Sequence, residues 1–310
     1  MEIRQFSYVS MVAECGSFTK AAARLFITQP ALSNYINKLE EDLGVRLFDR
    51  SVTPVKLTYA GEQYLEYAKN GQILVEGLQR KMRDISQNQT GRLRLGFPSE
   101  RIIYMLPLLL PVFQKEYSGV RIETVNGSGE HLMEALMTGG VDFVFMPVWN
   151  ARKGIGQYKV SDEELVLVAA KGYLKDEDLL DRERRIFNWK RISRLPLITL
   201  EKGHVLRNCV DTLLKGTGTT ANIRMESHSN MLSCRLAAQG VGVAVVPEIT
   251  VGMLRDTENM EYYHLAEYPV TWEVDALYRE DIYLGRLERD LLRIVRETLQ
   301  SHKKKLLGSF

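Results

Sequence analysis

The spacing of the apolar residues changes at about residue 90, and this change divides the chain into two parts of different fold class. Before it, apolar side chains recur every three or four residues, as on one face of an amphipathic helix. After it, short apolar runs bounded by Gly, Pro and polar residues alternate with helical stretches. Alternating strands and helices are typical of a parallel sheet covered by helices on both faces. We therefore predict a helical N-terminal domain followed by an α/β domain.

The helical part contains two short helices separated by a turn of about three residues. Ser17 is a suitable cap for the first of them, 18–25, and Thr28 is a suitable cap for the second, which ends at Gly44. Pro30 is tolerated in the first turn of that second helix because its missing N–H would have no partner there. Two helices around a tight turn are typical of a helix-turn-helix, whose second helix enters the major groove of DNA.

One face of this second helix is apolar, and the other bears short polar side chains. Amides can pair with adenine, and helix-start N–H groups can hold a phosphate. Basic residues of the β-like hairpin that follows, 45–57, can bind phosphates beside the groove. The residues expected to contact DNA are Thr28, Gln29, Pro30, Ser33, Asn34, Asn37, Lys38, Arg50 and Lys56. From periodicity alone, the alternative is the solvated polar face of any three-helix domain.

Net charge does not decide between these alternatives. The chain has a net charge of +2, and residues 1–65 contain seven basic and seven acidic side chains. A DNA-binding role therefore depends on where the charges point and not on their sum.

Cysteine content and the N-terminus indicate the compartment. The chain contains three cysteines, no CxxC motif and no Cys/His cluster, which favours reduced thiols and gives no support for a zinc site. Its N-terminus lacks the apolar segment of a signal peptide, and its longest apolar run, 102–113, is too short to cross a bilayer. We expect a cytoplasmic protein without membrane contact, metal or cofactor.

Several segments have a distinctive order of residues: Phe-Thr-Lys-Ala-Ala-Ala-Arg-Leu at 18–25, Thr-Gln-Pro-Ala-Leu-Ser at 28–33, Leu-Glu-Glu-Asp-Leu-Gly-Val-Arg-Leu-Phe-Asp-Arg at 39–50, and Leu-Thr-Tyr-Ala-Gly at 57–61. Together they closely resemble the N-terminal domain of LysR-type transcriptional regulators. Further on, Gly-Val-Gly-Val-Ala-Val-Val-Pro at 240–247 is similar to the glycine-rich strand entry of that family. The position after Ser33 is often Arg in the family and is Asn34 here, so the base preference of relatives is not transferred.

The resemblance implies a winged helix-turn-helix over 1–58, a dimerisation helix over 59–90 and an effector-binding domain over 91–310. The last of these would resemble periplasmic binding proteins, with lobe I at 91–163 and 266–300 and lobe II at 164–265. Members of the family usually regulate transcription in response to a small molecule and bind palindromic sites as dimers or tetramers. The implied partners are double-stranded DNA, a small-molecule effector, a second copy of the chain and RNA polymerase.

The expected dimerisation helix begins after Thr58 and has apolar residues near a 4-3 repeat. They are Ala60, Tyr64, Tyr67, Gly71, Leu74, Leu78 and Ile85. Such spacing is typical of a coiled-coil seam, and pairing two recognition helices raises the affinity for two half-sites. The alternative is a helix that packs on its own domain. A polar linker is expected at 87–91.

The α/β part contains two units of alternating strands and helices. The first has predicted strands at 93–97, 120–125 and 142–146, the second has predicted strands at 164–170, 197–200, 222–226 and 242–246, and a strand at 272–278 returns to the first unit. This order predicts two lobes crossed by two strands, with a cleft between the lobes. Ligands of open parallel sheets bind beyond the carboxyl ends of the strands, and nearby helix N-termini favour an anion such as a carboxylate. The residues expected to bind the effector are Ser99, Arg101, Ser128, Pro147, Thr199 and His204. The alternative for the serines is a role as helix caps, and the alternative for Arg101 is a pair with Glu100 or contact with solvent.

The patterns together predict a sequence-specific DNA-binding regulator controlled by a small organic anion. The alternatives are a regulator without an effector and a cytoplasmic solute-binding protein. We expect no enzymatic activity, because no third residue orients the Cys-His pairs near 204–209 and 228–234. A redox switch between Cys209 and Cys234 would need lowered thiol pKa values, and their flanks contain no basic cluster to lower them.

Overall fold

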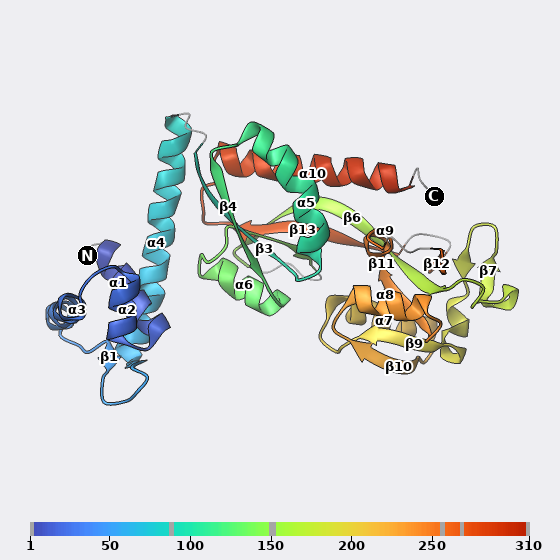
Figure 1. Ribbon diagram of the computed structural model, residues 1–310, viewed down its shortest axis with the longest axis horizontal. Helices are drawn as coiled ribbons and strands as arrows, with labels where there is room; N and C mark the ends of the chain where they lie inside the picture. Colours follow the sequence, from blue (N-terminus) through green and yellow to red (C-terminus); the bar gives the residue numbers. More distant parts are fainter. Residues whose placement is uncertain (1–2, 87–89, 149–152, 255–257, 267–269, 308–310) are drawn as a thin grey trace. The chain divides into compact units, whose positions relative to one another are not determined.

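The structure is a computed structural model that describes residues 3–86, 90–148, 153–254, 258–266 and 270–307. The chain forms two units (Figure 1). The first contains the residues up to 88 together with 137–140 and 281–287, and the second contains the rest. Most of the expected linker, 87–89, lies outside the described residues.

The N-terminal unit is built from helices and a short hairpin, in the predicted order. Ser17, Thr28 and Thr58 each accept a hydrogen bond from a backbone N–H of the helix that follows, at 3.4, 3.4 and 3.1 Å. These caps explain where three of the helices begin. The elements are α1 (Ile3–Cys15), α2 (Phe18–Arg24), α3 (Gln29–Leu43), β1 (Phe48–Asp49), β2 (Lys56–Leu57) and α4 (Tyr59–Ile85).

Gly61 allows α4 to pack directly on the hairpin. A Cβ atom at this position would lie 2.0 Å from the carbonyl oxygen of Leu47, which no side chain tolerates. The hydroxyl of Thr58, the residue before α4, also donates a hydrogen bond to the carbonyl of Arg46 in the hairpin, at 2.6 Å. The start of α4 is therefore fixed to the hairpin through backbone groups.

The second unit consists of two lobes. Lobe I contains β3 (Gly91–Phe97), α5 (Arg101–Glu116), β4 (Val120–Asn126), α6 (Gly129–Met137), β5 (Phe143–Pro147), β13 (Thr271–Arg279) and α10 (Arg286–Leu307). Lobe II contains η1 (Asp176–Asp178), β7 (Leu179–Asp181), β8 (Ile186–Phe187), η2 (Trp189–Arg194), β9 (Pro196–Leu200), α7 (Val205–Thr217), β10 (Asn222–Ser227), α8 (Asn230–Ala238), β11 (Val243–Pro247), α9 (Glu248–Gly252) and β12 (Met260–His264).

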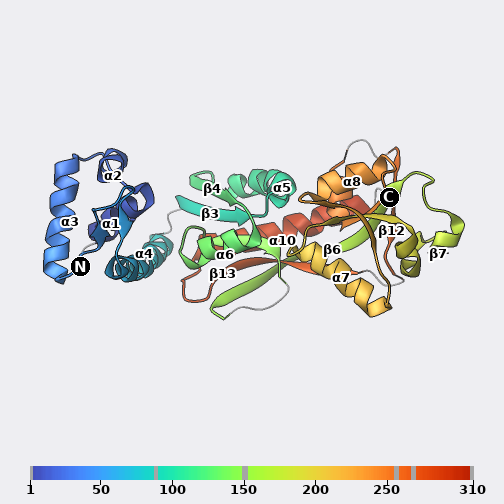
Figure 2. The same ribbon diagram turned by 90° about the horizontal axis from the view of Figure 1, so that it is seen from below.

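Strand β6 (Ile155–Ala170) belongs to both lobes, as both views show (Figures 1 and 2). Its first part, up to Glu164, pairs antiparallel with β13. Its last part, from Leu165 on, pairs antiparallel with β11 and β12. The residues around 164 therefore mark the passage from lobe I to lobe II.

The predicted α/β class is confirmed, with one correction to the sheet. Strands β3, β4 and β5 are parallel, as are β9, β10 and β11, but β6 and β13 run antiparallel to their neighbours. The sheet is therefore mixed and not purely parallel. The predicted strand 164–170 is only the second part of β6. The first part, which alternates polar and apolar residues, was not predicted, nor were β7, β8, β12 and α9.

Among the described residues, no helix combines the length and the hydropathy that a membrane span requires.

A matched pair of substitutions in α4 tests the packing at Gly61. Gly61→Ala is expected to lower the free energy of unfolding of the N-terminal unit by at least about 1–3 kcal/mol, because the added methyl group would overlap the carbonyl oxygen of Leu47. Gly77→Ala, where a Cβ atom meets nothing within 4 Å, is expected to raise it by up to about 1 kcal/mol. Chemical denaturation measures both. Equal effects of the two substitutions would contradict the packing described.

Candidate functional site

Helix α3 presents the residues that the sequence analysis assigned to DNA on its outer face. Its inner face is buried and consists of Leu32, Ile36, Leu39 and Glu40. On the outer face the assigned side chains are exposed or half-buried, and they are Thr28, Gln29, Pro30, Ser33, Asn34, Asn37 and Lys38. The face is thus open to a partner, with amides and hydroxyls near the start of the helix.

Arg50 is held by contacts within the N-terminal unit. Its guanidinium donates to the hydroxyl of Ser33 at 3.4 Å and to Glu40 at 3.2 Å, and it lies 4.6 Å from the ring centre of Phe18. The other carboxylate oxygen of Glu40 accepts from the backbone N–H groups of Leu47 and Phe48, at 2.7 and 3.1 Å. Arg50 and Glu40 therefore fix the hairpin to α3, a role that the sequence analysis did not assign to either.

Lys56 differs from Arg50 in its exposure. It lies on β2 of the hairpin and is exposed. Its acidic neighbour is Asp49. Hydrogen bonds from Ser51 lower the pKa of Asp49 most, and the charge of Lys56 lowers it further. Lys56 is therefore a basic residue of the hairpin that remains open to a phosphate.

The outer side of α4 bears an apolar stripe, which we call the α4 stripe. It consists of Tyr67, Leu74, Leu78 and Met82, whose side chains are 70%, 72%, 58% and 48% exposed. Of the expected seam, Tyr64 is buried and Gly71 packs against the ring of Phe6, so both belong to the core of the same unit. The side chain of Ile85 lies outside the described residues.

The two lobes are joined at the carboxyl end of β3 by Glu100. Its carboxylate accepts hydrogen bonds from the N–H groups of Asn230 and Met231, at 3.0 and 3.2 Å, and from the hydroxyl of Ser229. These groups form the N-terminus of α8 in lobe II, where a negative charge is favoured. The sequence contains no sign of this contact, because the partners lie 129–131 positions apart.

Two of the residues predicted to bind an effector cap helices. Ser128 accepts from the N–H of His131 at 3.3 Å, and His204 Nδ1 accepts from the N–H of Leu206 at 3.1 Å, so both cap helices. Partial desolvation lowers the pKa of the His204 ring, and the charge of nearby Glu100 opposes this shift.

The remaining predicted residues differ in exposure. Ser99 is exposed beside the start of α5, whereas Thr199 and Pro147 are buried at strand ends. Of the six, Arg101 is the one that points into a buried network.

Arg101 pairs with Glu163 at the passage between the lobes. Its guanidinium donates to both carboxylate oxygens, at 2.6 and 3.0 Å, while Glu163 also accepts from Tyr104 at 2.6 Å and from Trp272 Nε1 at 2.8 Å. Burial works to raise the pKa of Glu163, but Arg101 and these hydrogen bonds outweigh it and lower the pKa. The network connects α5, β6 and β13 and leaves Arg101 engaged with the protein itself.

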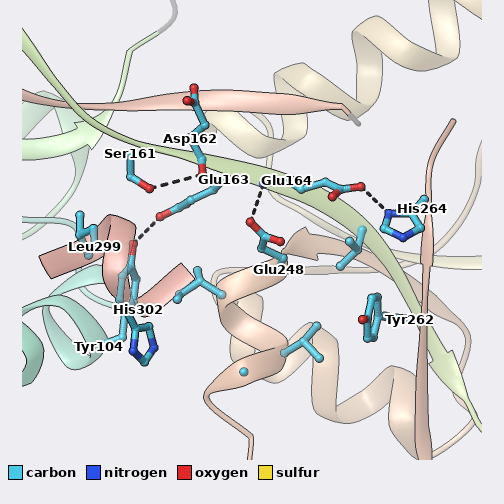
Figure 3. A pocket seen from close by; sticks show the side chains of 14 residues that line it. Tyr104, Ser161, Asp162, Glu163, Glu164, Glu248, Tyr262, His264, Leu299 and His302 are labelled. Carbon is cyan, nitrogen blue, oxygen red and sulfur yellow. Dashed lines mark hydrogen bonds and ion pairs between the residues drawn. The ribbon is translucent and has the colours of Figure 1, made fainter. Parts of the chain in front are cut away.

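A pocket lies beside this network (Figure 3). Its walls come from lobe I through Tyr104, Leu299 and His302, from β6 between residues 161 and 166, and from α9 and β12 of lobe II. It encloses about 740 Å³ of empty space, open solvent at its mouth included. None of the six residues expected to bind an effector lines it.

One feature of the sequence weakly indicates this pocket. Glu163 and Glu164 directly precede the apolar run of β6, and charges at the edge of a buried strand need partners. Both have one: Glu164 Oε1 lies 2.6 Å from Nδ1 of His264. Among the described residues, no group of three or more His, Cys, Asp or Glu side chains is placed to hold a metal ion.

The thiols of lobe II are poor nucleophiles. Burial raises the pKa of Cys209 to about 11 and that of Cys234 to about 12. Cys234 Sγ lies 3.5 Å from the sulfur of Met260, and neither cysteine is in a disulfide. Because the thiolate is the reactive form, both are expected to resist oxidation near neutral pH.

Both parts of the chain match family models. Residues 3–62 match the helix-turn-helix of bacterial regulatory proteins of the lysR family, and residues 86–300 match the LysR substrate binding domain.

Relatives match over most of the chain. The HTH-type transcriptional regulator ClcR of Pseudomonas putida is 30% identical over 290 residues, which cover 91% of this chain and 94% of ClcR. The structure of a full-length OxyR variant from Pseudomonas aeruginosa is similar with a TM-score of 0.72 and 21% identity, over 97% of this chain and 95% of that one. The structure of full-length CbnR complexed with its target DNA has a TM-score of 0.65 and 22% identity, over 96% and 100%.

Arg50 and Lys56 are predicted to act differently. Arg50→Ala is expected to lower the free energy of unfolding of the N-terminal unit by about 1–3 kcal/mol, because Glu40 and Ser33 lose a partner. Lys56→Ala is expected to change the free energy of unfolding by less than about 0.5 kcal/mol. It is also expected to reduce the salt slope, which is the slope of the logarithm of DNA affinity against the logarithm of salt concentration, by about 1. Denaturation and gel shifts over a salt series measure the two effects. An Arg50→Ala variant of normal stability with a reduced salt slope would instead make Arg50 a phosphate ligand.

The Arg101–Glu163 pair predicts a pH dependence. Because the pKa of Glu163 is lowered by folding, its contribution is complete above the usual carboxyl pKa of 4.5 and is lost as the pH falls through the folded value. Glu163→Gln is expected to lower the free energy of unfolding at neutral pH by about 3–5 kcal/mol and to weaken its fall on acidification. Glu273→Gln, at a side chain that is 60% exposed, is the control. An unchanged pH profile in Glu163→Gln would refute the assignment.

Proposed function

The chain belongs to the LysR family of bacterial transcriptional regulators, and on this premise we propose that it binds operator DNA as a dimer and responds to a small organic anion held between the lobes. The family membership accounts for DNA binding, transcription regulation and a substrate-binding domain. The proposal adds the contact residues, the dimer interface and the chemical class of the effector.

DNA contact is assigned to the outer face of α3. The amides of Gln29, Asn34 and Asn37 lie on an open face beside the capped start of the helix, which suits pairing with base edges. Lys56 and Lys38 lie where they can supply phosphate contacts. Arg50 holds the hairpin in place beside them. That CbnR is complexed with its target DNA is a fact about that protein, and it supports the same use of this domain here.

The α4 stripe is assigned to the dimer interface. Four large apolar side chains with 48–72% exposure on one helix are costly in water and are covered when two such helices pair. A dimer places two copies of α3 on one DNA molecule, and the second contact then forms at a high effective concentration. This division makes 1–58 the DNA-binding domain, 59–90 the dimerisation helix and 91–310 the effector domain.

The effector class rests on one observation: the N-terminus of α8 already holds a carboxylate, that of Glu100 from the other lobe. An effector carboxylate would bind the same N–H groups in place of Glu100. Ser99 and Ser128 follow β3 and β4, which pair with each other. The charge of Glu100 acts on the pKa of the His204 ring, so this ring is near Glu100. We assign these three side chains to contacts with the rest of the ligand. Such an exchange removes an internal contact between the lobes and so favours a different arrangement of them.

Two other functions are weighed against this proposal. A solute-binding protein without a DNA role would not account for the exposed amides of α3. An enzyme that uses a cysteine nucleophile would need a lowered thiol pKa, and the raised pKa values of Cys209 and Cys234 speak against one. We propose that the chain acts in the cytoplasm, where the DNA is, and regulates without catalysis, with RNA polymerase as a further partner.

DNA binding and the anion are tested together with the full chain. Selection from genomic fragments followed by footprinting is expected to give a protected region with two dyad-related half-sites; retention of no fragment would favour the solute-binding alternative. Benzoate, succinate and citrate are then compared with benzamide and succinamide by thermal shift. The carboxylates are expected to raise the melting temperature, and the amides are not.

Glu100→Gln identifies the place where the anion binds. Removing the internal carboxylate is expected to tighten binding of the active carboxylate several-fold, because its intramolecular competitor is lost. Glu130→Gln, an exposed carboxylate at the start of α6, is the control. Equal shifts by the amides, or weaker binding in Glu100→Gln, would contradict the proposal.

A further inference from the structure

Helix α4 is bound near its end to a segment that lies far from it in the sequence. The Asp84 carboxylate accepts hydrogen bonds from the backbone N–H of Arg286, at 3.0 and 2.9 Å, and from the hydroxyl of Tyr283, at 3.1 Å. Arg286 is the first residue of α10, and a negative charge is favoured at the start of a helix. Asp84 therefore fixes the start of α10 to α4, and this contact lies within the N-terminal unit.

A second contact fixes the middle of α4. The side chain of Ile73 is buried, and a Cβ atom at Gly139 would lie 2.8 Å from its Cγ1 atom. Gly139 has a φ of +71°, a conformation that favours glycine, so the chain turns here directly against α4. Gly139 lies between α6 and β5, and it also belongs to the N-terminal unit. Two segments that adjoin elements of lobe I therefore hold α4.

Further along the chain, α10 is bound to the end of α5. The hydroxyl of Tyr117, the residue after α5, donates a hydrogen bond to Asp290, and Arg293 pairs with Glu116 at 3.3 Å. Asp290 and Arg293 lie in the first two turns of α10 after Arg286. The first residues of this helix belong to the N-terminal unit, and the rest belong to the second unit. Helix α10 therefore connects α4 to α5.

Helix α5 begins where the two lobes are held together. Glu100, the residue before it, accepts hydrogen bonds from the start of α8 in lobe II. Arg101, its first residue, pairs with Glu163 of β6. The 16 residues of α5 cover about 24 Å at the usual rise of an α-helix. The contacts at its two ends thus form a continuous series from α8 through α5 and α10 to α4.

We propose that α5 and α10 carry the state of the Glu100 contact to the dimerisation helix α4, with Asp84 as the positioning residue through which α10 acts. The inference rests on the proposed function, in which an effector carboxylate takes the place of Glu100 at α8. The Arg101–Glu163 pair holds α5 at one point, so loss of the Glu100 contact changes the tilt of α5 about that point. Its other end then moves α10 through Tyr117, and α10 moves α4. Because α4 joins the two copies of α3, the affinity for the operator changes.

The test uses the full chain and a double-mutant cycle that needs no identified effector. Glu100→Ala removes the contact with α8 and is expected to change the affinity for the selected operator fragment by at least about threefold. In the presence of Asp84→Ala, the same substitution is expected to change this affinity by less than about 1.5-fold. Glu66→Ala, at an exposed carboxylate of α4, is the control and is expected to leave the full effect. Gel shifts measure all four affinities. An effect of Glu100→Ala that is equal with and without Asp84, or no effect in either background, would overturn the proposal.

Hydrogen exchange without DNA keeps this test separate from that of the proposed function. Glu100→Ala is expected to speed exchange of the Arg286 N–H several-fold, because movement of α10 opens its contact with Asp84. Tyr117→Phe removes one contact between α5 and α10, and adding Glu100→Ala to it is expected to speed this exchange no further; this pair of variants also serves if Asp84→Ala fails to fold.

The outcomes of the two tests differ. Unchanged exchange at Arg286 in Glu100→Ala would overturn the transmission through α5 and α10, even if the chain binds DNA and a carboxylate. Equal acceleration by Glu100→Ala with and without the Tyr117 hydroxyl would exclude the contact with Asp290 as the route. A chain that retains no DNA fragment would refute the proposed function, and faster exchange at Arg286 would then still support the transmission from α8 to α4.

Discussion

The second unit depends on one strand that serves two lobes and on the buried ion pair beside the point where it passes between them. Strand β6 pairs with β13 up to Glu164 and with β11 and β12 from Leu165 on. Glu163 stands at that border and is bound by groups from α5 and β13. A buried carboxylate is tolerated only while these partners remain, so the pair fixes α5 against both crossing segments. The pair therefore fixes lobe I at the point where β6 passes to lobe II.

Local signals were sufficient for the N-terminal unit. The caps Ser17, Thr28 and Thr58 and the apolar face of α3 act within a few residues, and they placed the helices within one or two positions of where they lie. What the sequence did not reveal is the use of Glu40 and Arg50. Glu40 looks like a solvated charge of a helix and Arg50 was predicted to contact DNA, and only the fold brings the two together beside Phe18. Arg50 therefore has a structural role beside its predicted contact with DNA, which stays a prediction.

The α/β unit was predictable in class and less so in detail. Strands with continuous apolar runs, such as β5 and β11, were found because burial on both faces demands such runs. The first part of β6 has exposed Gln157 and Lys159 among its residues and so lacked that signal. Glu100 was considered as a partner of Arg101, yet Arg101 pairs with Glu163 and Glu100 with α8. Contacts between positions more than 60 apart leave no periodic trace in the sequence.

The anion site that we propose follows from a contact between the lobes that differs from the buried pair. At α8 the N–H groups of a helix start attract a carboxylate, and Glu100 supplies one from the other lobe. An effector carboxylate that takes the place of Glu100 would remove this contact, while the Arg101–Glu163 pair beside β6 would remain. Because the effector would bind only the state in which Glu100 has left α8, it would favour a different arrangement of the lobes.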